Sequence, residues 1–184
     1  MRIIRKTPVF LVCIFLLSSC MKQVDFDQIK DLTFTPVFKA SVMHFTLNQV
    51  TFFDRINSLE IITPINRTSS FVSLNSSFVR NNLEEVHLEF EINNEFNRNF
   101  TAIFEFLDDN NVVTHSFQTF NIAANNLKYL HQEKIIVSGN QQFLSSTKIR
   151  AFIRLLPSTN GALIDPNVEK KLVFKTAGTF FLNI

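Results

Sequence analysis

The chain has 184 residues, a formal net charge of +2 and 18% charged residues, a balance that predicts no basic surface of the kind that holds nucleic acid. Its three glycines lie far apart and form neither a phosphate-binding loop nor a nucleophile elbow, both of which need glycine for close backbone approach. Twenty-two phenylalanines, beside one tyrosine and no tryptophan, predict a core made largely of phenylalanine.

The first 19 residues have the pattern of an export signal. Three basic residues come first, residues 8–17 are uncharged and apolar, and Ser18 and Ser19 are the small residues expected before a cleavage point. The apolar run is about half as long as the roughly 20 residues that a transmembrane helix needs. We therefore predict a signal peptide at 1–19 rather than a membrane span.

The residues at the predicted cut, Leu17-Ser18-Ser19-Cys20, resemble the lipobox of bacterial lipoproteins, in which a leucine stands three residues before a cysteine. The resemblance implies cleavage between Ser19 and Cys20, a diacylglycerol on the Cys20 thiol, and acylation of the new amine with a fatty acid such as palmitate. A thiolate is the nucleophile that this chemistry needs, and two or more acyl chains anchor a protein stably to a membrane. Met21, in place of Asp, implies the outer membrane by the enterobacterial sorting rule, on its periplasmic side or at the surface. The alternative is an inert cysteine in a signal that is cut elsewhere.

Cleavage would remove 19 of the 184 residues and leave 165, enough for one domain and a short tether. Three of the 18 Lys and Arg residues would leave with the signal, so the mature chain would have 15 basic side chains and 16 acidic ones. Cys13 would leave too and Cys20 would carry lipid, which excludes a disulfide and a cysteine-ligated zinc. We expect a tether at 20–31 and a single domain at 32–184.

The first part of this domain contains weak strand patterns. Residues 32–38 alternate, and Pro36 places this strand at a sheet edge because proline lacks the ladder donor. Residues 41–53 predict a strand that bends near Asn48, with five core candidates: Phe45, Leu47, Val50, Phe52 and Phe53. Ranges 58–65 and 69–80 are ambiguous, and 74–82 favours a turn or a single helical turn.

The clearest pattern spans 83–122. Four apolar residues alternate with polar ones in the first strand, as in a half-buried strand: Val86, Leu88, Phe90 and Ile92. A polar loop at 93–99 leads to a second strand, whose inward face is Phe100, Ala102, Phe104 and Phe106. The run Asp108-Asp109-Asn110-Asn111 predicts a turn, and 112–122 returns as the second arm of a hairpin.

The last part predicts a short helix in 123–130, a strand that ends at 135–137 and a turn at 138–140. Residues 148–156 alternate again, with Ile149, Ala151, Ile153 and Leu155 facing inward. Residues 171–184 predict one or two strands broken near Gly178. About eight short strands without a long helical period indicate an all-β, antiparallel β-sandwich, immunoglobulin- or fibronectin-like as first choice and a jelly roll as second.

Candidate chemical groups are few. His87, Glu89 and Glu91 share a strand face and form a weak candidate metal site, but same-face neighbours lie almost 7 Å apart. The alternative is a solvated face, paired with basic residues such as Lys148, Arg150 and Arg154. The acidic turn at 108–111 could bind calcium weakly, although it lacks the glycine and distal glutamate of an EF-hand.

His44, His115 and His131 are scattered and have no nucleophile motif near them, so we expect no catalysis and no cofactor. Adjacent phenylalanines such as Phe180-Phe181 point to opposite faces of a strand, and an exposed member would mark a partner surface. We expect a lipid-anchored lipoprotein of the bacterial cell envelope with a non-catalytic β-sandwich that binds or scaffolds a protein partner. The alternative is an envelope enzyme or a carbohydrate-binding module, which a pocket joining two or more histidines with carboxylates would favour.

Overall fold

The structure, a computed structural model, describes residues 34–159 and 161–184, and Thr35–Ile184 form one compact unit. The signal peptide, the tether and the predicted cleavage and lipid site at Ser19 and Cys20 lie outside the described residues. No helix in the described ranges is long and apolar enough to cross a membrane.

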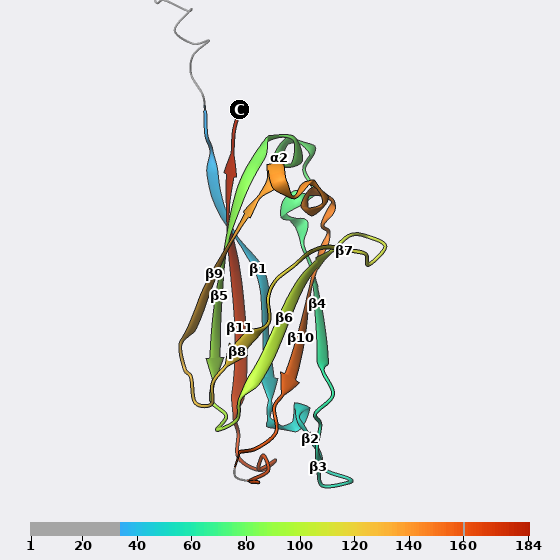
Figure 1. Ribbon diagram of the computed structural model, residues 1–184, viewed down its shortest axis with the longest axis vertical. Coiled ribbons are helices and arrows are strands. Elements are labelled where there is room, and N and C mark those ends of the chain that lie inside the picture. Colours follow the sequence, from blue (N-terminus) through green and yellow to red (C-terminus); the bar gives the residue numbers. More distant parts are fainter. Residues whose placement is uncertain (1–33, 160) are drawn as a thin grey trace, which may run out of the picture. The chain divides into compact units, whose positions relative to one another are not determined.

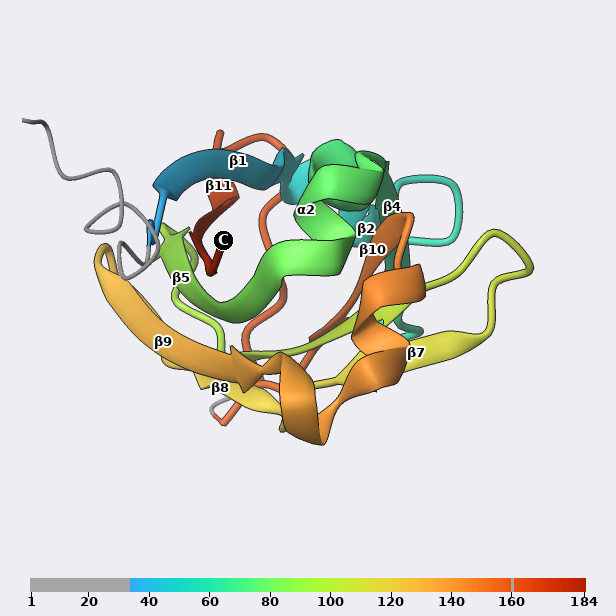
Figure 2. The same ribbon diagram turned by 90° about the horizontal axis from the view of Figure 1, so that it is seen from above.

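Two antiparallel sheets pack face to face (Figures 1 and 2). The four-stranded sheet has the order β1 (Val37–Asn48), β11 (Lys171–Leu182), β5 (Leu83–Asn94), β9 (Tyr129–Ile136). The second sheet has the order β4 (Ile65–Ser70), β10 (Lys148–Leu155), β6 (Phe100–Leu107), β7 (Val113–Ser116), with β8 (Phe120–Ile122) also paired to β6. A two-stranded hairpin of β2 (Phe53–Asp54) and β3 (Leu59–Glu60) extends from the lower end in Figure 1.

Short helical segments fill the connections: α2 (Ser77–Asn82) and the 3-10 turns η3 (Gln49–Thr51), η4 (Val72–Leu74), η5 (Val137–Gly139) and η6 (Gln141–Ser145). Helix α2 confirms the single helical turn expected in 74–82. The helix expected in 123–130 is wrong, because these residues form turns that lead into β9.

The strand order is that of a jelly roll. If β7 and β8 are counted as one interrupted strand, the two sheets contain eight strands, as in a jelly roll. The prediction of an antiparallel β-sandwich is confirmed. The immunoglobulin-like first choice is wrong in its topology, since β1 pairs with the last strand, β11, and not with the strand that follows it in the chain.

Phenylalanine fills the space between the sheets, as the composition predicts. The largest fully buried side chains include ten phenylalanines: Phe52, Phe71, Phe90, Phe96, Phe100, Phe104, Phe106, Phe143, Phe174 and Phe180. The inward faces predicted for β5, β6 and β10 are all buried. Each fully buried phenylalanine contributes about 1.5–3 kcal/mol through the area that it removes from water.

Strand β1 contains a bulge between Ser41 and Met43, so that Val42 and Met43 are both buried. The extra residue shifts the alternation, as bulges do, and Leu47 beyond it still faces the core. Of the edge strand predicted at 32–38, residues 34–36 lie outside any strand and 37–38 begin β1, which is the edge strand of the four-stranded sheet. The core prediction for Val50 is wrong: its side chain is 43% exposed on η3, after the strand has ended.

The predicted polar loop at 93–99 is largely buried. Strand β5 continues to Asn94, whose Nδ2 donates to the carbonyls of Arg98 (2.9 Å) and Ala123 (2.8 Å). The Oδ1 of Asn94 accepts the amide of Phe96 at 3.0 Å. The loop prediction is thus confirmed for 95–99 and wrong for 93–94, which belong to β5, and Asn94 satisfies backbone groups of the loop that water would otherwise bind.

Strand β11 runs without a break through Gly178, so the predicted interruption is wrong. The ring of Phe180 occupies the space that a side chain at Gly178 would fill, with 2.9 Å between an ideal Cβ at 178 and the Phe180 Cε2 atom. Phe180 also stacks on Phe38 of β1, with ring centroids 4.7 Å apart. The glycine therefore marks close packing and not a turn.

Replacing Gly178 by alanine is expected to lower the free energy of unfolding by about 1–3 kcal/mol, as overpacking of a dense core does. Gly139→Ala is the matched control, since no atom lies within 4 Å of a Cβ there, and it should be neutral or stabilising by up to about 1 kcal/mol. Urea unfolding of both variants measures the difference. Equal stabilities would show that the Phe180 ring moves aside freely.

Candidate functional site

The outward face of the four-stranded sheet carries most of the predicted site residues. Because side chains alternate along each strand, residues paired across the four strands form rows on this face. Three successive rows are Val37–Phe181–Glu85–Ile136, Lys39–Thr179–His87–Lys134 and Ser41–Ala177–Glu89–Gln132. A hollow of about 390 Å³ lies over the β5, β9 and β11 part of these rows.

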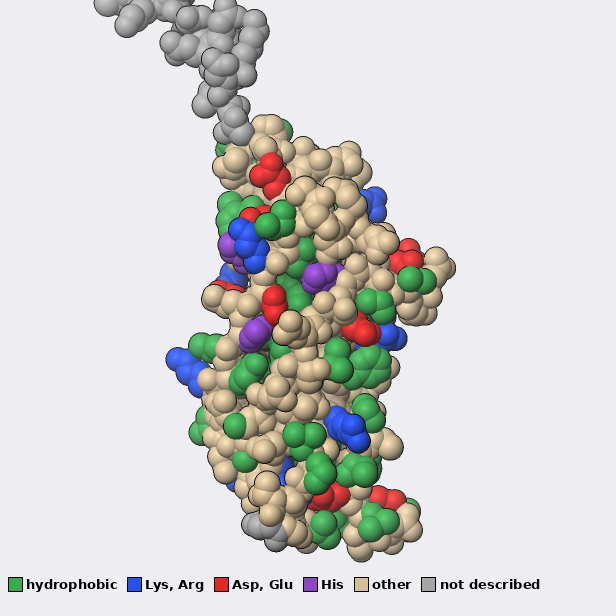
Figure 3. Space-filling view, viewed as in Figure 1, with side chains coloured by type: hydrophobic (Ala, Val, Ile, Leu, Met, Phe, Trp, Pro, Cys, Tyr) green, Lys and Arg blue, Asp and Glu red, His purple; other side chains and the backbone are tan. Residues whose placement is uncertain are grey.

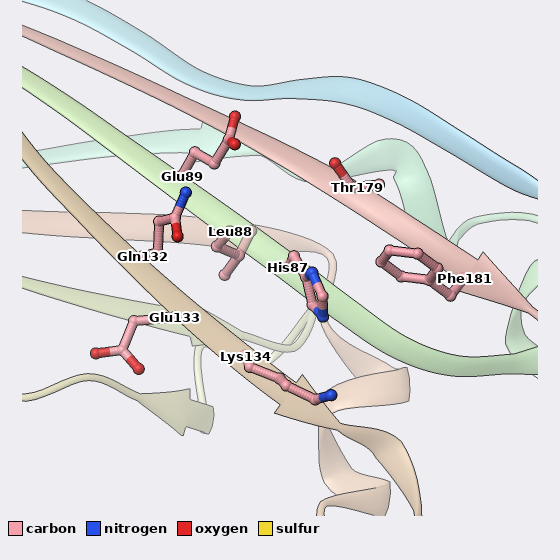
Figure 4. Close-up of a pocket in the computed structure, with 8 residues that line it drawn as sticks. All are labelled: His87, Leu88, Glu89, Gln132, Glu133, Lys134, Thr179 and Phe181. Carbon is pink, nitrogen blue, oxygen red and sulfur yellow. The ribbon is translucent and has the colours of Figure 1, made fainter.

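His87 lies on the floor of this hollow. Figure 4 shows it on β5, between Phe181 on β11 and Lys134 on β9. The His87 and Phe181 rings are 4.7 Å apart, and the His87 Nε2 is paired with Glu85. Glu85 also binds Lys134 at 2.5 Å, and chiefly this hydrogen bond lowers the pKa of the Glu85 carboxyl. A carboxylate held ionised by a lysine is a poor general base.

The predicted metal candidates do not converge. Glu89 pairs with Lys39 of β1 at 2.5 Å, and Glu91 pairs with Lys175 of β11 at 2.9 Å. Among the residues that the structure describes, no group of three His, Cys, Asp or Glu side chains is placed to hold a metal ion. Each carboxylate of the His87, Glu89 and Glu91 set is thus engaged by a cation of the same sheet.

The expected pairing of this face with Lys148, Arg150 and Arg154 is wrong, because all three lie on β10. Lys148 and Arg150 lie on β10, in the other sheet, where Arg150 binds Glu105 of β6 at 2.6 Å. Lys148 Nζ donates to Asn111 Oδ1 (2.9 Å) and to the Asp109 carbonyl (3.1 Å). The lysine therefore binds two of the oxygen atoms of the acidic turn.

That turn is the predicted hairpin turn. The Asp108 carboxylate accepts the amides of Asn110 (2.9 Å) and Val112 (2.8 Å), and Asn111 has φ of 65°. Both β7 and β8 then pair with β6, which confirms the returning arm.

The four histidines lie apart on the described surface, and Figure 3 shows histidine side chains as separate purple spots. His44 lies in a second hollow of about 330 Å³, beside Glu89 and Glu91. Neither this hollow nor that of His87 contains a second histidine. The arrangement that would favour an enzyme is not formed in either hollow.

His115 lies on β7 and His131 on β9, which are edge strands of the two sheets. Asn140 Nδ2 donates to the His115 Nδ1 at 2.5 Å, and the His115 ring packs 4.7 Å from that of Phe117. His131 packs 4.4 Å from the Phe120 ring and binds Glu133 at 2.7 Å. Both imidazoles cover core phenylalanines, which is a structural role.

Burial lowers the pKa of His115 below its ordinary 6.5, and the charge of Glu133 opposes this shift. The unfolded chain therefore binds the proton first, so stability is complete above about pH 6.5 and falls as the pH drops towards the pKa of the folded state. Thermal unfolding between about pH 7 and pH 5 should show this loss. His115→Gln should have a shallower pH dependence, and an unchanged slope would contradict the assignment.

A further site lies at the end of the sandwich opposite the start of β1, here called the distal end and made of the β2–β3 hairpin and the 156–168 loop (Figure 1). Asp54 Oδ1 accepts the amides of Ile56 (2.9 Å) and Asn57 (3.2 Å), which fixes the hairpin turn. The hydrogen bond from the Asn57 side chain, followed by these two backbone bonds, lowers the pKa of the Asp54 carboxyl. Ile56 at the tip is 94% exposed.

The hairpin is fastened to the rest of the domain by charged groups. Arg98, only 4% exposed, is paired with Glu60 of β3 and donates to the carbonyls of Leu156 (2.7 Å) and Ala162 (3.2 Å). Glu60 Oε1 also accepts the amide of Ile164 at 2.7 Å. No pattern in the sequence indicates this cluster, because Arg98 stands in what reads as a polar loop.

Large apolar side chains are exposed around this fixed tip: Ile56, Leu59, Ile62, Leu163 and Val168. A shallow hollow of about 250 Å³ lies beside them and includes Phe96 and Ile164 in its lining. The bond from Arg55 Nη2 to the Pro166 carbonyl (2.8 Å) holds the hairpin next to the loop. The distal end thus exposes several aliphatic residues beside a hairpin that polar bonds fasten to the loop.

No protein-family model and no curated protein matches the chain. Among solved structures, it is similar to a protein of Parabacteroides distasonis inferred to be secreted, with a TM-score of 0.50 and 11% identity over 64% of this chain and 38% of that chain. For the tailspike protein 4 enzymatically active domain of bacteriophage CBA120, the TM-score is 0.40 and the identity 10%, over 79% of this chain and 19% of that chain. For the VP2 subviral particle of infectious bursal disease virus, the TM-score is 0.39 and the identity 9%, over 80% of this chain and 32% of that chain. The chain spans less than two fifths of the length of each of these, and the first likeness shows the fold alone.

Proposed function

We propose that the chain is a lipoprotein of the bacterial cell envelope, anchored through Cys20, whose jelly roll binds a protein partner with its distal end and performs no chemistry. One observation carries the proposal: Ile56 is 94% exposed at the tip of a hairpin that polar bonds hold rigid. Exposed aliphatic residues gathered at one place mark interaction surfaces in soluble domains.

Rigidity is what makes this surface suited to a partner. The hairpin is fixed by Asp54 within its turn, by the Arg98–Glu60 pair at its base and by Arg55 at its side. A surface that is already ordered loses little conformational entropy on binding, so more of the contact energy appears as affinity. Side chains near the centre of an interface contribute most to affinity when they are fully desolvated.

The outward face of the four-stranded sheet supports a non-catalytic role. Its carboxylates are engaged by lysines of neighbouring strands, and its two hollows each hold one histidine. We therefore assign neither a substrate nor a cofactor to it.

Site-specific photocrosslinking in cells tests the distal end. A photoreactive phenylalanine analogue at position 56 should crosslink to one discrete protein. The same analogue at Leu130, 60% exposed on β9 of the sheet face, is the matched control and should not. Ile56→Asp in the purified chain should then weaken binding of the captured protein by at least about tenfold, the equivalent of about 1.4 kcal/mol. Equal crosslinking at both positions would contradict a distal binding surface.

The anchor rests on the lipobox-like residues 17–20 and agrees with the inferred secretion of the Parabacteroides distasonis protein. Membrane fractionation of a Cys20→Ser variant is the test. This variant should take up no labelled fatty acid and should leave the membrane fraction, whereas wild-type fractionation would overturn the anchor. Met21 favours the outer membrane as the destination.

A further inference from the structure

We infer that the near end of the sandwich, where β1 begins, lies against the surface of a phospholipid bilayer, with Val72 and Phe78 in contact with lipid. This inference rests on the proposed anchor at Cys20. The near end consists of the start of β1, η4, α2 and the end of β11, which lie together at the top of Figure 1 and face the viewer in Figure 2.

The length of the chain outside the domain limits how far this end can lie from the membrane. Cys20 precedes Val37 by 17 residues, which span at most about 60 Å even when fully extended. The 12 residues of β1 add about 40 Å between the near end and the distal end. The tether joins the domain at the near end, so contact of the distal end with the bilayer would use about 40 Å of the tether, and the near end is the one that reaches the bilayer with the least extension.

Apolar side chains project from the near end although their neighbours in sequence are buried. In η4, Val72 is 66% exposed between the buried Phe71 and Leu74. In α2, Phe78 is 51% exposed while the adjacent Val79 packs against the core. The short segments are thus held in place by their inner residues and present an aliphatic and an aromatic side chain outward. Such side chains partition into the interface of a bilayer.

The charge beside these residues fits lipid phosphates. Val72 lines a hollow of about 410 Å³ together with Arg80 and Lys148, whose cationic groups outnumber the single carboxylate there, that of Asp109. Arg80 has no ion pair with any residue in 34–159 or 161–184. A cation near an anionic membrane contributes about 1 kcal/mol to its attraction. Apolar contact and charge therefore favour the same surface.

The lipidated chain in vesicles of phosphatidylethanolamine and phosphatidylglycerol tests the inference. Under the proposed function, Cys20 carries lipid and the mature chain has no free thiol, so a single added cysteine takes an environment-sensitive fluorophore. The fluorophore on Phe78→Cys should shift to the blue and be quenched by lipids that carry a quencher. The fluorophore on Ile56→Cys, at the distal end, is the matched control and should show neither effect. Adding Arg80→Gln should lower the ratio of contacting to free domains about fivefold.

The outcomes separate this inference from the anchor on which it rests. If the chain floats with the vesicles and neither fluorophore is quenched, the domain stands away from the bilayer and the inference is overturned. Quenching at position 56 instead of 78 would overturn it as well. A chain that fails to float at all would overturn the anchor, and the inference with it.

Discussion

Replacement of Arg98 by alanine is expected to lower the free energy of unfolding by about 3–5 kcal/mol, the usual effect of removing one partner from a buried ion pair. The substitution would leave the Glu60 carboxylate buried, with the Ile164 amide as its one remaining partner among the described residues. It would also leave the carbonyls of Leu156 and Ala162 without the bonds that Arg98 gives them. Urea unfolding followed by circular dichroism measures the loss.

Arg67→Ala is the matched control, because Arg67 is exposed on β4 and bonds only the neighbouring Asn66 carbonyl (3.0 Å) among the contacts described. It should change stability by less than about 0.5 kcal/mol. The double variant Arg98→Ala with Glu60→Ala should be less destabilised than the sum of the single variants, since the two residues are coupled. Additive effects would show that the pair does not hold the hairpin.

Replacement of Phe104 by alanine is expected to lower the free energy of unfolding by about 3–5 kcal/mol through lost burial and the cavity left behind. Phe104 is fully buried on β6, and its ring contacts Phe90 and Phe174 of the facing sheet, with centroids 4.8 and 6.0 Å away. It therefore joins the two layers of the sandwich, and its loss should be measurable as a lower midpoint in urea.

Phe78→Ala removes the same group from a half-exposed position and is the control for Phe104→Ala. Its effect on stability should stay within about 0.5 kcal/mol. A loss at position 104 no larger than at position 78 would contradict a core built on stacked phenylalanines.

Local patterns in the sequence were sufficient for β5, β6 and β10 and their inward faces, but not for the short strands β2, β3 and β4. The alternation in β5, β6 and β10 reflects one buried face per strand, which any pairing would bury. The pairing of strands is non-local. Strand β1 pairs with β11, more than 120 residues away in sequence, and the alternation within a strand does not indicate its partner. This is why the sandwich could be predicted and its topology could not.

The same limit applies to the candidate sites. His87, Glu89 and Glu91 were correctly placed on one face, but the lysine partners of Glu89 and Glu91 come from β1 and β11 and follow from register alone. Gly178 read as a break because its neighbour in space, the Phe180 ring, cannot be inferred from its neighbours in sequence. The rigid hairpin at the distal end depends on Arg98, from a loop about 40 residues away.

Mass spectrometry of the intact chain purified from its native membrane tests the account most directly. The account predicts a polypeptide that starts at Cys20 and carries a diacylglycerol on sulfur with a further acyl group on the amine. A mature chain with an unmodified thiol at Cys20, or one that retains residues 1–19, would contradict it.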